Sequence, residues 1–285
     1  MKTVNKAQHT GIASIGSICD GFDLKRDAYY KFKRRYERKE VRKNIVVELV
    51  KHERKDQPRT GGRKLYQTLK PDLHITDIKV GRDKLFDILR ENDLLVKRKK
   101  AYCKTTNSYH RFHKYKNLIK DSKITKPNQV WVADITYIRM VRGFCYLALI
   151  TDVFSRKIVG YDISDSLELA GCLRALKLAL RTARPAAGLV HHSDRGIQYC
   201  SDQYTQKLIA KGIAISMTEE NHCYENAIAE RVNGILKDEY YLDQCFFNSQ
   251  CACNAAKNAI DIYNSKRLHL SLGYKTPDMV FKNES

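Results

Sequence analysis

The sequence predicts a mixed α/β domain, preceded by a basic helical region and followed by a short helical segment. After Gln129, three apolar runs separated by turn residues form the pattern of a three-stranded meander. Helical and strand patterns then alternate up to about residue 240. Lys and Arg outnumber Asp and Glu by 52 to 32, a formal charge of +20. This excess is more than solubility requires and predicts attraction to a polyanion, nucleic acid first.

The sequence lacks the marks of membrane and disulfide-rich proteins. No apolar run approaches the roughly 20 residues that span a bilayer, and Met1–Asn5 leads into no apolar signal core. Nine cysteines, an odd number spread mostly singly, predict reduced thiols. We therefore expect a cytosolic protein without a membrane partner.

The first region, residues 1–44, is predicted to be a helical basic arm. Residues 12–30 indicate two short helices broken at Asp20-Gly21. Residues 31–39 continue as a basic helix with interleaved aromatic residues. This stretch is either a DNA-contacting arm or a solvated helical linker, and the charge pattern alone leaves both open.

The second region, residues 45–100, is predicted to hold three short helices. The first helix carries an apolar stripe of Ile45, Val46, Leu49 and Val50. The second runs from Arg63 to Leu69, and after a break at Pro71 the third begins near Gly81. With Arg63 and Lys64 facing outward, the segment suits a helix-turn-helix DNA-binding module. A small three-helix bundle without DNA binding is the alternative.

Residues 101–125 are predicted to be a basic linker. The stretch around it is rich in Lys, Arg, His and aromatic residues and poor in aliphatic ones. Such a segment can lie along phosphates with rings available for stacking, or it can be a disordered tether that orders on DNA. The candidate DNA contacts here are Lys99, Lys100, Arg111 and Lys114.

The core, residues 126–242, is predicted to contain five strands and three helices. The strands cover 130–138, 144–152, 157–163, 188–192 and 214–216, and the helices cover 167–182, 201–211 and 224–240. Residues 243–285 form the C-terminal helical segment. From the pattern alone, this element order indicates a mixed α/β fold.

Three carboxylates in this core stand out. Asp134 lies inside the first strand, Asp194 follows the fourth strand just before a turn at Gly196, and Glu230 lies on the last helix. Three carboxylates at one end of a sheet need a counter-charge, and hard oxygen ligands favour Mg²⁺ or Mn²⁺. A two-metal carboxylate site is one solution for displacement at a phosphodiester. Asp152, near a hairpin turn, is predicted to serve the backbone instead.

The last core helix carries a polar face. Asn226, Glu230, Asn233 and Lys237 follow one another at steps of four, three and four residues, so they share one side of the helix. Together with the apolar residues on the same helix, this stripe is more typical of a site than of a solvated surface.

Four sequence blocks, in order, resemble a known family. They are 131–138 (WVADITYI), 192–199 (HSDRGIQY), 224–230 (YENAIAE) and 263–277 (YNSKRLHLSLGYKTP). The chain is similar to the second-reading-frame transposases of the insertion sequence 3 family, and its core to the DDE transposases and retroviral integrases. The interval between Asp194 and Glu230 also matches that family. Glu225 and Arg231-Val232 depart from its usual pattern.

The resemblance implies an RNase H-like integrase core and a DNA transposase. Asp134, Asp194 and Glu230 would bind two Mg²⁺ ions, with Mn²⁺ as a substitute, and catalyse DNA cleavage and strand transfer of an insertion sequence. Asn233 and Lys237 would contact the reacting DNA. Residues 45–100 would be the family's helix-turn-helix segment, and Arg267 in the C-terminal block is a candidate phosphate contact.

The resemblance also implies partners. Holding two element ends and target DNA at once implies a homo-oligomer on DNA, associated with the nucleoid in the bacterial cytosol. In related elements an upstream frame supplies a further helix-turn-helix protein. Two other functions stay open: a metal-dependent nuclease of the same fold, and a non-catalytic DNA-binding regulator derived from a transposase.

Overall fold

The computed structural model describes residues 14–97, 112–120, 122–219 and 226–283. The chain divides into two compact units. One comprises residues 1–55 with 61–96, and the other comprises residues 56–60 with 97–285.

The first unit begins with helix α2 (Ile15–Gly21) and helix α3 (Arg26–Asp56). Ser14 caps α2 by accepting a hydrogen bond from the Ser17 amide, and the predicted break after Gly21 is confirmed. The 31 residues of α3 contain no Gly or Pro, and ion pairs such as Lys31–Asp27 span its turns. The predicted boundary between residues 44 and 45 therefore falls inside one continuous helix.

Helices α4 (Gly62–Ile75) and α5 (Arg82–Glu91) complete a three-helix core with α3. Two details of the prediction were wrong. The stripe of α3 comprises Val46, Val47 and Val50, whereas Ile45 is exposed. Helix α4 also continues through Pro71, because the stripe Leu65, Leu69, Leu73 keeps its last turn packed against the core.

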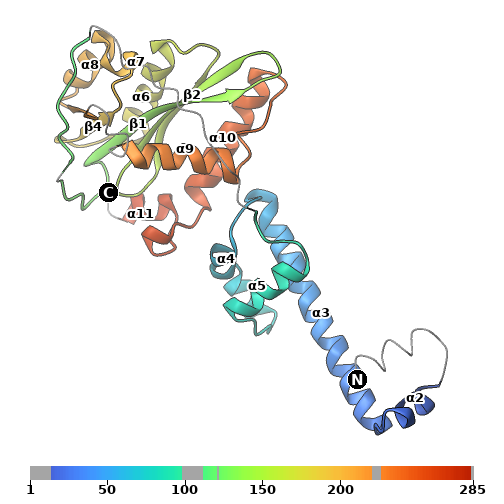
Figure 1. Cartoon of the computed structure of the whole chain (residues 1–285). Helices are drawn as coiled ribbons and strands as arrows, with labels where there is room; N and C mark the ends of the chain where they lie inside the picture. Colours follow the sequence, from blue (N-terminus) through green and yellow to red (C-terminus); the bar gives the residue numbers. More distant parts are fainter. Residues whose placement is uncertain (1–13, 98–111, 121, 220–225, 284–285) are drawn as a thin grey trace. The chain divides into compact units, whose positions relative to one another are not determined.

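The second unit is built on a five-stranded mixed sheet of order β3-β2-β1-β4-β5 (Figure 1). The strands are β1 (Val130–Arg139), β2 (Phe144–Asp152), β3 (Ile158–Ser164), β4 (Val190–Ser193) and β5 (Ala214–Met217). The first three form the predicted antiparallel meander, and β4 and β5 run parallel to β1.

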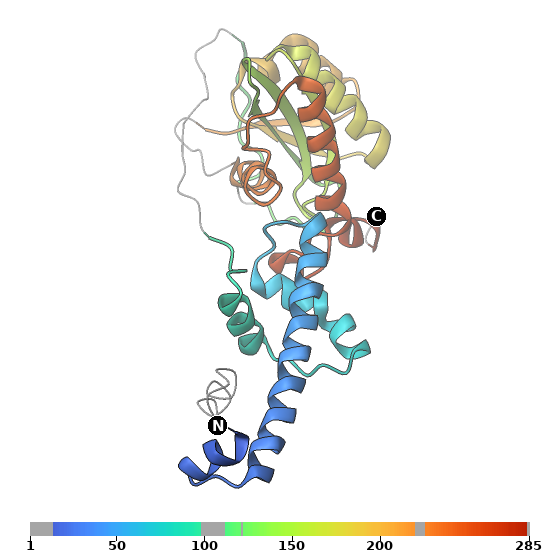
Figure 2. The same ribbon diagram turned by 90° about the vertical axis from the view of Figure 1, so that its right-hand side faces the viewer.

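Helices cover both faces of this sheet (Figures 1 and 2). One apolar layer packs against α6 (Leu169–Ala183), α7 (Ile197–Cys200) and α8 (Asp202–Ile209). The other packs against α9 (Ala227–Glu239) and α10 (Ser249–Ser265). The short η2 (Leu270–Leu272) and α11 (Pro277–Asn283) follow. The helix predicted at 201–211 is observed as α8, and the short helix α7 precedes it.

Gly160 lets α6 approach the sheet closely. A Cβ atom built there would lie 2.3 Å from the carbonyl oxygen of Ala175 and 2.7 Å from Cβ of Ala179. No side chain fits in that space, so Gly160 sets the distance between β3 and α6.

The described part of the predicted linker lies against the core. The Leu118 amide donates to Ser216 Oγ at 2.8 Å, and Lys116 carbonyl accepts from the Met217 amide. Tyr115, Ile119 and Ile124 pack on buried clusters of the sheet. Residues 112–120 and 122–125 are therefore part of the second unit's fold.

Candidate active site

The sheet opens between β1 and β4 at the two predicted aspartates. The parallel pairing of these strands ends at Ala133 opposite Ser193, while β1 continues along β2 to Arg139. Asp134 directly follows Ala133, and Asp194 directly follows Ser193. The carboxyl end of β4 therefore places Asp194 beside Asp134, at the type of crevice where open α/β sheets hold their sites.

Asp134 is held by two hydrogen bonds, and its pKa is raised. Its Oδ1 accepts from the Ile135 amide at 2.8 Å, and its Oδ2 accepts from Asn233 Nδ2 at 2.7 Å. Burial, and next the negative charge of Asp194, raise the pKa of Asp134 from 3.8 to about 7; the two hydrogen bonds oppose this and Glu230 adds to it. The predicted carboxylates therefore act on one another electrostatically.

Asp194 is fixed by the turn that follows it. Its Oδ1 accepts from the Gly196 amide at 3.0 Å, and a Cβ at Gly196 would lie 3.0 Å from that oxygen. A glycine at this position leaves room for the carboxylate to fold back over the turn.

Helix α9 lies along β1 through the polar face predicted from its spacing. Asn226 Nδ2 donates to the Ala133 carbonyl at 3.2 Å, Asn233 holds Asp134, and Lys237 Nζ lies 4.2 Å from the centre of the Tyr137 ring. The contacts run in sequence order along both α9 and β1. They fix the register of α9, on which Glu230 lies exposed between the two asparagines.

Asn226 and Asn233 take a role that the sequence did not reveal. They are only 4% and 6% exposed, and the Oδ1 atom of each has no hydrogen-bond partner within the described ranges. A buried Asn233 positions Asp134 instead of facing outward toward DNA. The polar spacing was the one available signal, and it did not show which atoms the amides contact.

The donors at this site fit a hard divalent cation. The carboxylates of Asp134 and Asp194, and the Oδ1 atom of Asn233 that has no hydrogen-bond partner within the described ranges, are oxygen ligands of the kind that Mg²⁺ takes. Within the described residues, no group of three or more His, Cys, Asp or Glu is close enough to hold one ion. The strand ends place Asp134 and Asp194 next to each other, and Glu230 lies on the helix that packs along β1.

Asp152 and the two histidines beside Asp194 have structural contacts. Asp152 is fully buried and accepts hydrogen bonds from the amides of Asn128 and Ser155 and from Ser155 Oγ, in agreement with its predicted backbone role. His192 Nδ1 shares a hydrogen bond with Ser216 Oγ at 2.8 Å. Burial lowers the pKa of His191 to about 3, so this ring is neutral.

The candidate DNA contacts fall into three groups. Arg63 is exposed and Lys64 half-buried on the first turn of α4, and Lys114 is half-buried on the segment that lies against β5. Lys99, Lys100 and Arg111 lie outside the described residues. Lys237 is half-buried, and burial lowers its pKa while the charges of Asp134 and Asp243 oppose this.

Arg267 lies in the interior instead of on a DNA-facing surface. It is 5% exposed, and its guanidinium donates to both carboxylate oxygens of Glu239, at 2.7 and 2.9 Å. Nη1 is also 3.0 Å from His269 Nε2. The expected phosphate contact is corrected accordingly: this buried pair joins the C-terminal block to the end of α9.

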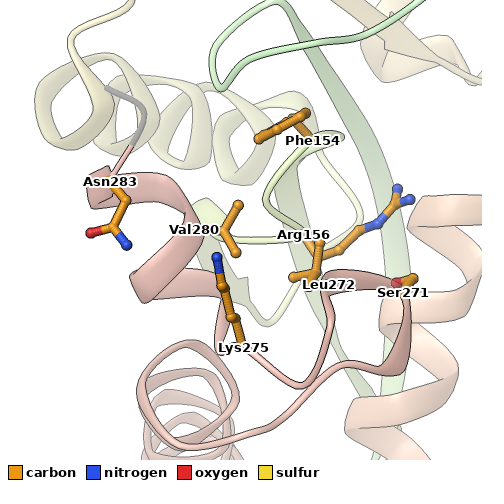
Figure 3. Close-up of a pocket in the computed structure, with 7 residues that line it drawn as sticks. All are labelled: Phe154, Arg156, Ser271, Leu272, Lys275, Val280 and Asn283. Atoms are coloured by element: carbon orange, nitrogen blue, oxygen red, sulfur yellow. The ribbon is translucent and has the colours of Figure 1, made fainter.

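A separate pocket of about 290 Å³ lies between the β2–β3 turn and the C-terminal segment (Figure 3). Phe154, Arg156, Ser271 and Lys275 are among its lining residues. In Figure 3 the charged ends of Arg156 and Lys275 point away from each other, so the two cations do not converge on one ligand position. The pocket contains none of the predicted site residues.

Comparisons with known proteins agree with this geometry. A model of the integrase core domain matches residues 124–223, and a second integrase core domain model matches residues 211–277. The 31 kDa protein of insertion element IS600 from Shigella sonnei is 38% identical over 267 residues, which cover 91% of this chain and 96% of that protein. The IS904 transposase of Lactococcus lactis is 32% identical, with coverages of 86% and 96%. Transposase InsF of insertion sequence IS3A from Escherichia coli is 28% identical over 100% of this chain and 99% of its own length.

The chain belongs to the insertion sequence 3 family of transposases. The resemblance seen in the four sequence blocks is confirmed, and so is the α/β integrase core with helices before and after it. In this transposase the core domain match includes Asp134 and Asp194, and the second match includes Glu230. No helix among the described residues is long and apolar enough to cross a membrane.

Proposed function

We propose that this transposase cleaves DNA at the ends of an insertion sequence and joins the ends to new DNA in Mg²⁺-dependent phosphoryl transfers. The observation that carries the proposal is the coupling of Asp134 to Asp194 and Glu230 where β1 and β4 separate. Asp134, Asp194 and Glu230 are the proposed catalytic and metal-binding residues. Bound ions, two Mg²⁺ or in their place Mn²⁺, supply activation of the attacking oxygen and stabilisation of the leaving oxygen.

The protein's own groups prepare this site. The Ile135 amide and Asn233 hold the two oxygens of Asp134, which fixes this carboxylate where β1 and β4 separate. Asn226 fixes the start of α9 against β1, so that Glu230 stays over the same opening. Lys237, at the far end of the same helix face, supplies a positive charge near Asp134 and is our proposed contact to a DNA phosphate.

The other DNA contacts are proposed to come from both units. The three helices over residues 45–100 would bind duplex DNA through Arg63 and Lys64, and the basic segment with Lys99, Lys100, Arg111 and Lys114 would follow the backbone. A homo-oligomer would hold two element ends, and an upstream-frame helix-turn-helix protein is a further candidate partner. The charge of +20 supports the DNA-binding part of this proposal.

A strand-transfer assay with labelled element-end DNA and Mg²⁺ tests the proposal. We expect joined products from the wild type and none from Glu230→Gln, with DNA binding retained by both proteins. Asp238→Asn changes an exposed acid on the same helix and serves as the matched control. The new amide keeps an oxygen that can accept from Arg59, so joining should be retained. Cleavage without joining would identify a nuclease, and binding without cleavage in every protein would identify a regulator.

A further inference from the structure

Two aromatic rings stand next to the active-site helix. The Tyr137 ring lies under Lys237 Nζ at 4.2 Å and meets the Phe144 ring edge to face, with 5.4 Å between ring centres. Tyr137 is three residues beyond Asp134 on β1, and the charge of Asp134 acts on Lys237. A continuous set of interactions therefore links the proposed catalytic carboxylate to these rings.

The outer ring of the pair faces solvent. Phe144, the first residue of β2, is 44% exposed, and Val141 in the preceding turn is 64% exposed. Single exposed apolar residues are common, but this ring is held in place by Tyr137 beside a functional site. Phe144 thus presents an exposed aromatic ring that packs against Tyr137.

The positive charges around the rings indicate an anionic ligand. Lys237 lies on one side, and Arg139 and Arg142, both exposed, flank the β1–β2 turn. Aromatic rings next to Lys and Arg are the combination that binds unpaired nucleic acid, because bases stack on rings while cations hold phosphates. A second copy of this chain would bring like charges together at the same place.

We infer that Tyr137 and Phe144 form a stacking surface, the aromatic shelf, for an unpaired base of the DNA strand whose phosphate lies at Asp134, Asp194 and Glu230. The inference rests on the proposed function for the identity of the ligand. Phe144 stacks on the base, and Tyr137 supports Phe144 and holds Lys237. The shelf favours DNA ends that are already unpaired, since unpairing a base costs a few kcal/mol.

The test compares binding of a fully paired duplex end with a forked end of the same length, using the full-length protein in EDTA so that no chemistry occurs. We expect the wild type to prefer the forked end by about tenfold, in line with one stacked base. Phe144→Leu keeps an apolar side chain but removes the ring, and should abolish most of this preference. Phe144→Tyr keeps the ring and should restore it.

Phe247→Leu is the matched control. Phe247 is another exposed ring, 79% accessible, and it follows Phe246, which forms a β-bridge with Met140. This control should keep the wild-type preference. Photocrosslinking with 5-iodouracil in the unpaired strand should label the peptide that contains Tyr137 and Phe144. Equal binding of forked and paired ends by the wild type, or a preference unchanged by Phe144→Leu, would overturn the inference. A change in oligomeric mass in Phe144→Leu with the preference intact would also overturn it, in favour of a protein contact. Binding is measured without metal, so the two proposals can fail separately. A wild type that prefers forked ends but joins no DNA would refute the proposed function and not the inference about the aromatic shelf.

Discussion

Replacing Asp134 by Asn should stabilise the metal-free transposase at alkaline pH. The folded structure raises the pKa of Asp134 from 3.8 to about 7, first through burial and then through the charge of Asp194. The ionised carboxylate is therefore less favourable in the folded state than in the unfolded chain. Asp134→Asn removes the charge while keeping the size of the side chain.

The pH dependence follows from this rise in pKa. Below pH 3.8 the carboxyl is protonated in both states and costs nothing. As the pH rises toward about 7 the unfolded chain releases its proton first, so the wild type loses stability relative to the variant. The full rise would correspond to ~4 kcal/mol. Because solvent and ions reach this partly buried group, we expect roughly 2–4 kcal/mol above pH 8.

The hydrogen bonds at Asp134 allow this substitution. A new amide can accept one hydrogen bond where the carboxylate accepts two, from Ile135 and Asn233. The Asn233 side chain can turn over, because its Oδ1 has no partner within the described ranges and can accept from the new amide. The loss of hydrogen bonding is therefore small compared with the charge that is removed.

Urea denaturation between pH 5 and pH 9 in EDTA, followed by circular dichroism, measures the effect. Asp134→Asn should gain on the wild type as the pH rises, and added Mg²⁺ should stabilise the wild type more than the variant. Asp152→Asn is the comparison variant. Burial also raises the pKa of Asp152, but the three hydrogen bonds that it accepts from Asn128 and Ser155 oppose that rise and are weakened in the variant. Asp152→Asn should therefore gain less on the wild type with rising pH than Asp134→Asn does. A destabilised Asp134→Asn at pH 8, or a difference that does not change with pH, would refute the reasoning.

Three further predictions concern residues around the site. Asn233→Ala should lower the strand-transfer rate by about tenfold or more with unchanged DNA affinity, because it removes the group that holds Asp134; a purely reduced affinity would instead indicate a DNA contact. Arg267→Leu should cost about 3–5 kcal/mol in urea denaturation, because it removes the two hydrogen bonds and the positive charge that the guanidinium gives to Glu239. The double variant with Glu239→Leu should recover much of this loss, and loss of DNA binding at full stability would contradict the prediction. Gly160→Ala should cost roughly 3 kcal/mol or more in the same assay, since its Cβ would meet the Ala175 carbonyl, and a neutral effect would show that α6 can move.

Much of the fold follows from short-range patterns in the sequence. The three meander strands are observed within one residue of their predicted bounds, because each is an apolar run between turn residues. The sequence failed where packing overrides local preference. Pro71 predicts a helix end, but the stripe of Leu65, Leu69 and Leu73 carries α4 beyond it.

The helix face that carries the proposed site residues was predictable from the sequence, and the contacts of that face were less so. The spacing of Asn226, Asn233 and Lys237 gave the face of α9 that meets β1, because helix periodicity fixes which residues share a side. It could not show that Asn233 turns inward to Asp134, or that Arg267 is buried against Glu239. Those contacts join residues far apart in the chain, and an exposed and a buried Arg look alike in a sequence.

Asp134 and Asp152 illustrate how the same side chain takes two roles in one sheet. Asp152 accepts three hydrogen bonds from its own turn and from Asn128, and these offset part of its burial. Asp134 accepts two and faces the further negative charge of Asp194 and Glu230, which hydrogen bonds do not neutralise. In the metal-free fold, a neutral residue in place of Asp134 would remove this unfavourable charge from β1. A cation bound beside Asp134 would offset this unfavourable charge, and the proposed metal-dependent reaction accounts for the aspartate in that way.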